Sequence, residues 1–287
     1  MISSQELRQK SIDYRKTILT MIKRSGTGHT AGSLSCVDIL NVLYNRVMNI
    51  SPENFASPYR DHYIHSKGHS VEALYAVLAD RGFFPAEQLE TFSRYQSHLV
   101  GHPTRKVPGI EQNTGALGHG LSVAVGLALA AKKDGRADRV FTLLGDGELA
   151  EGSSWEASLS AAHYKLDNLV VIVDRNGLQI TGRTEAVMGL ESLPEKFRAF
   201  GYAVKTVSGN DVAELAQAFE QLPFEAGKPN LVLARTVKGY GISFMEDQVK
   251  WHHKVPSDEE FAQAMRELDA AALNVSPLAA TETARVL

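Results

Sequence analysis

Two short apolar runs, each followed at once by polar turn residues, constrain this chain more than any other feature. The run VFTLL at residues 140–144 precedes Gly-Asp-Gly, and the run LVVIV at 169–173 precedes Asp-Arg-Asn-Gly, which places Asn176 30 residues after Asp146. The segment 154–164 between the runs has a helical pattern, so the whole is a βαβ unit with parallel strands and a right-handed crossover. Both turns then open on one edge of a sheet, where α/β proteins bind ligands.

The rest of the chain fits an α/β fold with a mostly parallel central sheet and helices on both faces. After the βαβ unit, strand-like runs at 202–207 and 231–234 flank a helical pattern at 212–222. The segments before it have apolar residues at helical spacing, and we expect helices there. These segments are 4–24, 37–47, 71–80 and 121–133. The alternation of strands and helices predicts a parallel sheet covered on both sides.

The chain is expected to form one domain over residues 1–273. A closing helix is predicted at 257–272. The remainder, 274–287, is predicted to be a tail that is loosely held or used in a contact.

Charge and apolar patterning exclude several classes of protein. With 30 basic and 33 acidic residues, a net charge of −3, the chain has no basic surface of the kind that binds nucleic acid. The N-terminus is polar, and no apolar run approaches the roughly 20 residues that cross a bilayer. The single cysteine, Cys36, fits a reducing compartment. We therefore expect a cytoplasmic protein with neither nucleic acid nor membrane among its partners.

The polar residues after the two strands have the chemistry of a divalent metal site. The carboxylate of Asp146, the amide oxygen of Asn176 and a nearby backbone carbonyl are hard ligands, and diphosphate oxygens with water would complete octahedral coordination of Mg²⁺. The glycines beside Asp146 let the backbone approach a phosphate closely. Two ordinary turns are the alternative, because Asp-Gly and Asn-Gly are common turn dipeptides. Their joint position at the strand ends favours the ligand site.

These stretches resemble the thiamine diphosphate motif, and the surrounding sequence resembles transketolases in particular. The resemblance is carried by GDGELAEGSSWEA from residue 145 and HYKLDNLVVIVDRNGLQI from residue 163. Four further stretches agree in order along nearly the whole chain: GTGHTAGSLS, HSKGHS, GHPTRKVPGIEQNTGALGHGLSVAVG and TVKGYGISFM. Residues 1–273 are thus identified as the diphosphate-binding (PP-type) domain, and the chain resembles the N-terminal subunit of a two-chain transketolase.

The resemblance implies roles for particular positions. It assigns a divalent metal, Mg²⁺ or in its place Ca²⁺ or Mn²⁺, to Asp146, Asn176 and the backbone carbonyl of Leu178. Contacts with thiamine diphosphate are assigned to a second set: His69, Gly115, Ala116, Leu117, Gly147, Glu148, Glu151 and Asn176. Glu151 matches a glutamate that joins the two active sites of a dimer.

Three histidines, His29, His102 and His252, would face the substrate as catalytic residues. An imidazole with an ordinary pKa near 6.5 can give and take protons near neutrality, which suits the binding of sugar hydroxyls and the movement of protons. His253 is an alternative to His252, because the two are adjacent in the run KWHHK.

The activity implied by the resemblance is that of a transketolase, a glycolaldehyde transferase. A two-carbon ketol unit would pass from a ketose phosphate to an aldose or its phosphate, by default in pentose phosphate metabolism, with the cofactor carrying the carbanion chemistry. In this family a glutamate of a separate pyrimidine-binding domain activates the cofactor. The expected partner is therefore a C-terminal transketolase subunit that carries this domain. An α₂β₂ heterotetramer is expected, and the chain alone is expected to be inactive.

The sequence departs from the family pattern near the expected cleft. The usual SGHPG reads TGHTA at 27–31, and the loss of the proline predicts a looser loop around His29. The usual GQG reads GHG at 118–120, and His65 replaces an apolar residue before SKGH. These changes bear on substrate preference and leave the metal motif intact.

Other classes of function explain less of the sequence. A zinc hydrolase could use the pair His65 and His69, or His98 and His102, but a glycine inside the first pair and a proline beside the second disfavour helices there. The alternatives within the cofactor class are a 2-oxoacid dehydrogenase α chain and a deoxyxylulose-phosphate synthase. A non-catalytic binding protein on the same fold is a further alternative.

Overall fold

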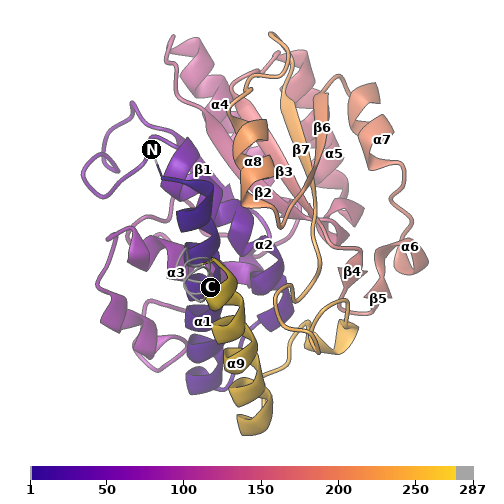
Figure 1. The fold of residues 1–287 in the computed structure, drawn as a ribbon. Coiled ribbons are helices and arrows are strands. Elements are labelled where there is room, and N and C mark those ends of the chain that lie inside the picture. The colour runs from indigo at the N-terminus through magenta and orange to yellow at the C-terminus, as the bar shows by residue number, and fades with distance from the viewer. Residues whose placement is uncertain (1, 276–287) are drawn as a thin grey trace, which may run out of the picture.

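A five-stranded parallel sheet lies at the centre of the computed structural model, which describes residues 2–275 (Figure 1). Its strand order is β1-β2-β3-β7-β6, and every neighbouring pair is parallel. The strands are β1 (His62–His65), β2 (Val140–Gly145), β3 (Leu169–Arg175), β6 (Ala203–Ser208) and β7 (Asn230–Arg235). The short strands β4 (Leu178–Gln179) and β5 (Gly182–Arg183) form a separate antiparallel pair. The predicted parallel sheet is confirmed.

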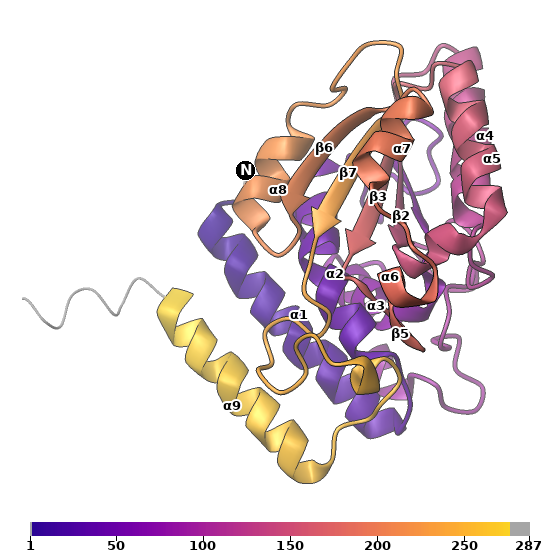
Figure 2. The same ribbon diagram turned by 90° about the vertical axis from the view of Figure 1, so that its right-hand side faces the viewer.

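Helices cover both faces of the sheet (Figure 2). The helices are α1 (Ser4–Ser25), α2 (Thr30–Val42), α3 (Val71–Asp80), α4 (Gly120–Lys133), α5 (Gly152–His163), α6 (Thr184–Val187), α7 (Leu193–Ala199), α8 (Val212–Phe219) and α9 (Asp258–Val275). Successive residues of β2 point into opposite cores: Phe141 and Leu143 pack with α1, α2, α3 and α8, whereas Val140 and Leu144 pack with α4, α5 and α7. This alternation, with both faces buried, explains why the central strands are continuous apolar runs in the sequence.

Two elements differ from the sequence prediction in the first third of the chain. The strand β1 was not predicted, because its four residues, HYIH, include two histidines and are too few to show a strand pattern. The helix expected from residue 37 begins at Thr30 instead. All residues of α2 are buried, so its early turns have no polar face that would mark them as helix.

The closing helix α9 runs three residues past its predicted end, to Val275. No proline or glycine occurs between Asp258 and Pro277, and the side chain of Gln5 donates to the carbonyl of Val275 at 2.7 Å. The predicted tail therefore begins inside a helix, and its residues 276–287 lie outside the described part of the chain. The extent of the domain, 1–273, stays a prediction. None of the helices in residues 2–275 is both long and apolar enough to cross a membrane.

Candidate active site

A cavity of about 310 Å³ lies at the carboxyl ends of the central strands. The turns after β1, β2 and β3 all contribute to its walls, because parallel strands end on the same edge of the sheet. Most of the predicted site residues line it: His29, His69, Gly115, Leu117, Asp146, Gly147, Glu148, Asn176, Leu178 and His252. The fold thus gathers residues from both ends of the chain around one space.

Three predicted site residues lie outside the cavity lining. His102 is exposed but adjacent, with its ring centroid 6.2 Å from that of His29. Ala116 and Glu151 are exposed. Glu151 packs against Gly118, where an added Cβ atom would lie 2.6 Å from the Cβ atom of Glu151.

The three predicted metal ligands are held by hydrogen bonds at the ends of β2 and β3. Asp146 Oδ1 accepts from the Gly147 N–H at 2.8 Å, and Oδ2 accepts from the Gly177 N–H at 2.6 Å and from Arg175 Nη1 at 3.1 Å. Burial and the nearby Asp174 carboxylate raise the pKa of Asp146. The side chain of Asn176 accepts from the Leu178 N–H at 3.1 Å.

The third predicted metal ligand, the backbone carbonyl of Leu178, already accepts a hydrogen bond from a lysine ammonium. Lys238 Nζ donates to the backbone carbonyl of Leu178 at 3.1 Å, and both residues line the cavity. A carboxylate, an amide oxygen and a carbonyl that accepts from a cation are a donor set that could hold a hard divalent cation. The set includes one acidic side chain only, so further ligands would have to come from water or an anionic molecule.

A buried ion pair of Lys67 and Asp174 supports this end of the cavity. Lys67 Nζ donates to Asp174 and, at 3.1 Å, to the Gly32 carbonyl. Burial opposes the charge of Lys67, but the carboxylate outweighs it and raises the lysine pKa. Asp174 also accepts from Ser35 Oγ at 2.7 Å and from Thr236. Sequence reasoning missed Asp174, although a carboxylate directly after an apolar strand was the available signal.

Lys238 adds a second ammonium group near the candidate metal ligands. Burial and the neighbouring Lys67 lower the pKa of Lys238 to about 8, so most of these side chains are charged at neutral pH. The ammonium groups of Lys67 and Lys238 can donate to an anionic group here, in the presence of the carboxylates of Asp174 and Asp146.

Glu148 ties together three loops around the cavity. Its Oε1 accepts from the hydroxyl of Ser66 and from the Gly118 N–H at 2.9 Å, and its Oε2 accepts from the Gly145 N–H at 3.0 Å. Burial raises the pKa of the carboxyl group. Because both oxygens have protein partners, the structure shows Glu148 as a positioning residue; its predicted contact with a cofactor stays a prediction.

The loop at residues 114–117 packs directly on its neighbours and requires glycine at Gly115. This residue has φ of +133°, and a Cβ atom there would lie 2.6 Å from the ring of His102. Thr114 Oγ1 donates to the carbonyl of His65 at 2.7 Å, which fastens the loop to β1. The predicted cofactor-binding stretch is thus held in place at the wall of the cavity, which Gly115 and Leu117 line.

Five histidine rings form a cluster, and three of them, His29, His69 and His252, line the cavity. The ring centroid of His29 lies 5.4 Å from His69, 5.7 Å from His252 and 4.6 Å from His253, and His102 completes the group. Burial, then the facing imidazoles, lowers the pKa of His29 to about 4. Burial, then Lys238, lowers the pKa of His252 to about 3. These two rings are neutral at pH 7 and can accept protons or bond to hydroxyl groups.

His65 is buried beside this cluster but is not available as a metal ligand. Its Nδ1 is bonded to Tyr63 Oη at 2.8 Å and its Nε2 to Ser70 Oγ at 2.9 Å. Both ring nitrogens therefore have protein partners. Within residues 2–275, no three His, Cys, Asp or Glu side chains are grouped so that they could hold a metal ion, and the zinc alternative gains no support.

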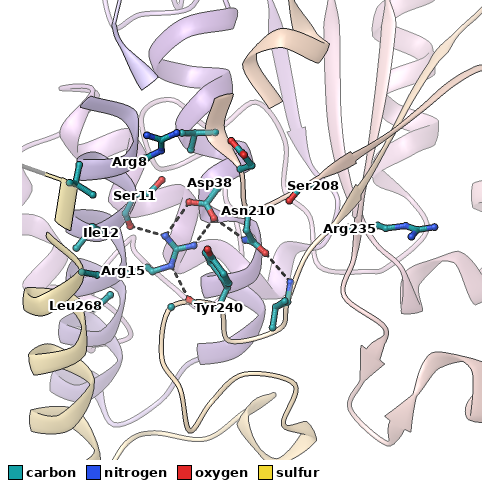
Figure 3. A pocket seen from close by; sticks show the side chains of 16 residues that line it. Arg8, Ser11, Ile12, Arg15, Asp38, Ser208, Asn210, Arg235, Tyr240 and Leu268 are labelled. Carbon is teal, nitrogen blue, oxygen red and sulfur yellow. Dashed lines mark hydrogen bonds and ion pairs between the residues drawn. The ribbon is translucent and has the colours of Figure 1, made fainter. Parts of the chain in front are cut away.

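A larger cavity of about 550 Å³ lies between α1, α2 and α9 and contains none of the predicted site residues (Figure 3). Its floor is the buried pair of Arg15 and Asp38, joined at 2.6 Å. All five N–H groups of Arg15 have protein partners: Asp38, Tyr240, Ser11 and Leu34. This guanidinium is satisfied by the fold, so it joins α1 to α2 and has no donor left for a ligand.

The sheet and the cavity at its carboxyl edge define an α/β domain with a candidate ligand site at the strand ends. Residues 7–274 match the family model described as transketolase, thiamine diphosphate binding domain. The chain therefore belongs to the transketolase family, as its sequence motifs predicted.

Curated relatives, each named as one subunit of a transketolase, align with nearly the whole chain. The apulose-4-phosphate transketolase subunit of Phocaeicola vulgatus is 45% identical over 92% of this chain and 94% of its own length. The relative of the same name from Actinobacillus succinogenes is 47% identical over 93% and 97%. The 6-deoxy-6-sulfo-D-fructose transketolase subunit SqwG of a Clostridium species is 41% identical over 92% and 96%.

Solved transketolases share the fold but are longer. The structure of the Campylobacter jejuni transketolase superposes with a TM-score of 0.87 at 29% identity, over 96% of this chain. This chain spans 46% of that protein and 40% of human transketolase, to which it is 37% identical.

Proposed function

We propose that this chain is the N-terminal subunit of a two-chain transketolase. In this proposal it transfers a two-carbon ketol unit from a ketose phosphate to an aldose or aldose phosphate, using thiamine diphosphate and Mg²⁺. The observation that carries the proposal is one cavity lined both by oxygen donors and lysines and by neutral histidines. Those two sets of residues match the two parts of the reaction, namely holding a diphosphate with its metal and moving protons on a sugar.

The oxygen donors and lysines would hold the metal and the diphosphate. Asp146, Asn176 and the Leu178 carbonyl fit Mg²⁺ because all three donors are oxygens and the carbonyl already accepts from an ammonium. His69, Gly147 and residues 115–117 would contact the cofactor, whose bound form supplies the carbanion chemistry. In this structure the Gly147 N–H donates to Asp146, which keeps the carboxylate oriented.

The histidines would bind and orient the sugar. Neutral imidazoles at His29 and His252 can donate to or accept from hydroxyl groups, and each can hold a proton that leaves a hydroxyl oxygen. His102, at the rim, would act with them. His252 lines the cavity whereas His253 does not, which favours His252 as the residue matched by the family pattern.

The partner would be a C-terminal subunit with the pyrimidine-binding domain, in an α₂β₂ assembly. Relatives that align along 94–97% of their own length are named as one subunit of a transketolase, which supports a two-chain enzyme. Glu151 is exposed and could reach a second copy of the chain. The substrate would be a sugar phosphate or a similar anionic sugar, and the reducing cytoplasm is the expected location.

The test is a titration of thiamine diphosphate and Mg²⁺ into the complex of the chain with its partner, measured by calorimetry. Asp146→Ala should abolish the Mg²⁺-dependent part of binding, whereas the control Asp134→Ala, at an exposed residue outside the cavity, should not. Unchanged Mg²⁺-dependent binding by Asp146→Ala would contradict the metal assignment.

Activity is tested by following the sugars formed from D-xylulose 5-phosphate and a panel of aldose phosphates. Ketol transfer should require both subunits, thiamine diphosphate and Mg²⁺. Full activity of the single chain would contradict the two-chain proposal, and formation of deoxyxylulose phosphate or acyl products would favour the other thiamine diphosphate enzymes.

A further inference from the structure

The start of α2 is fastened to the segment that carries His252 and His253. Thr30 is fully buried, and its hydroxyl donates to the carbonyl of Lys254 at 2.6 Å. The other end of that segment is anchored by Trp251, which is fully buried and donates from Nε1 to the carbonyl of Phe244 at 3.1 Å. The two histidines are therefore held between two fixed residues.

The backbone of His29 is fixed from the opposite side by α3. Its N–H donates to Glu72 Oε1 at 2.9 Å, and Glu72 is completely buried. Gly28 has φ of +151°, and a Cβ atom there would lie 2.8 Å from the same carboxylate oxygen. The loop around His29 is thus bonded to α3 and, through Thr30, to the His253 segment. The hydroxyl of Thr30, which proline lacks, makes this bond, and the looser loop expected from the loss of the proline stays a prediction.

These restraints bring His253 against His29. Their ring centroids are 4.6 Å apart at an angle of 61°, the shortest separation within the histidine cluster. His29 lines the cavity, whereas His253 is exposed beside it. The imidazole of His253 therefore lies at the mouth of the cavity, where the outer part of a bound sugar would pass.

We propose that His253 is a specificity-determining residue that bonds to hydroxyl groups of the sugar at the mouth of the cavity, and that Thr30 positions it against His29. The inference rests on the proposed function, because it takes a sugar as the ligand. The other titratable groups that face His29 are His69, His102, His252, Lys67, Lys238 and Glu72.

The first experiment compares steady-state kinetics of the two-subunit complex. His253→Ala should raise KM for D-xylulose 5-phosphate or for the acceptor about tenfold, the loss of roughly one hydrogen bond to substrate, with kcat changed less than about twofold. Affinity for thiamine diphosphate should be unchanged. The control His98→Ala, at an exposed residue outside the cavity, should alter neither constant.

Thr30 variants separate positioning from a general effect on folding. Thr30→Val keeps the shape of the side chain and removes the hydroxyl, so it should raise KM as His253→Ala does. Thr30→Ser keeps the hydroxyl and should have the KM of the wild type. Equal kinetics of Thr30→Val and the wild type would overturn the positioning role. Unchanged KM values in His253→Ala, in a wild-type complex that is active, would overturn the specificity role.

A second experiment needs no activity. His253 contributes to lowering the pKa of His29, after burial, so NMR titration of the imidazoles should show a higher His29 pKa in His253→Ala and Thr30→Val but not in Thr30→Ser. Unchanged His29 titration in both variants would show that the rings are not in contact and would overturn the inference. A wild-type complex that transfers no ketol unit contradicts the proposed function instead, so the two failures are distinguishable.

Discussion

Lys67 and Asp174 illustrate what a single buried pair does at the edge of the sheet. Asp174 is the last residue but one of β3, and its carboxylate accepts from Lys67, Ser35 and Thr236. The pair joins the turn after β1 to the end of β3. The same turn carries His69, so the charge pair also sets the position of a predicted cofactor ligand.

The Asp174→Asn variant should lose about 3–5 kcal/mol of stability, because it leaves the Lys67 ammonium buried without a compensating charge. Urea unfolding measured by circular dichroism gives the difference. The matched control is Asp269→Asn, which removes an ion pair of the surface with Lys16 and should cost less than about 1 kcal/mol. Equal losses in the two variants would show that burial of the pair contributes nothing.

Individual residues of the site were predictable where a motif identified them. Asp146 and Asn176 follow apolar strands at a spacing that only one topology explains, so their proximity could be foreseen. The partners of Lys67 and Glu148 could not be, because their hydrogen bonds join loops that are distant in sequence. The hydrogen bond between Thr30 and Lys254 could not be predicted for the same reason.

The position of helix α4 depends on one close contact, between its first residue and Ser66. At its first residue, Gly120, an added Cβ atom would lie 2.3 Å from Ser66 Oγ and 2.8 Å from Ser66 Cα. Gly126, in the middle of the same helix, is exposed and has open space around its Cα. The start of the helix is therefore pressed against the turn that follows β1, while its outer face is not constrained.

Two substitutions on α4 should change stability in opposite directions. Gly120→Ala should destabilise the chain by about 1–3 kcal/mol, because the methyl group overlaps the backbone of Ser66. Gly126→Ala should stabilise it by up to about 1 kcal/mol, since alanine favours an exposed helix interior. Thermal unfolding of the two variants beside the wild type checks the signs. A stabilising Gly120→Ala would show that α4 is free to move away from β1.

Elements were predictable where their pattern was long and regular. The runs that became β2 and β3 are buried on both faces and read as strands without ambiguity. The edge strand β1 was missed because it owes its conformation to pairing with β2, which the four local residues do not encode.

At the scale of the whole molecule, several buried histidines make stability depend on pH. Burial lowers the pKa of His65 to about 3, of His29 to about 4 and of His252 to about 3, below the ordinary value near 6.5. Between those values the unfolded chain binds more protons than the native chain, so stability falls as the pH falls below about 6.5. Glu72 and Glu148 have the opposite effect on stability. Burial raises their pKa values, so they take up protons more readily in the native chain and offset part of the loss at low pH.

Replacing His65 should therefore reduce the sensitivity to acid. Because its ring is fully buried and its pKa is lowered, His65 alone should reduce the free energy of unfolding of the wild type by about 2 kcal/mol between pH 6.5 and pH 5. The variant His65→Phe should lack this part of the loss, whatever its stability at pH 7. Urea midpoints at pH 7 and pH 5 measure the difference. His98→Asn, at an exposed position, serves as the control, and an equal acid loss in His65→Phe and the wild type would contradict the assignment.

The order of the strands also governs how the chain can fold as it leaves the ribosome. β1 pairs only with β2, some 75 residues later, and β3 pairs on its outer side with β7, which ends at Arg235. The edge of β3 therefore stays open until most of the chain has been synthesised. Sheets built from such distant pairings form slowly, and open strand edges invite association with other chains. In a nascent chain of this topology the edge of β3 is exposed to other chains until β7, the last strand of the sheet in sequence order, emerges.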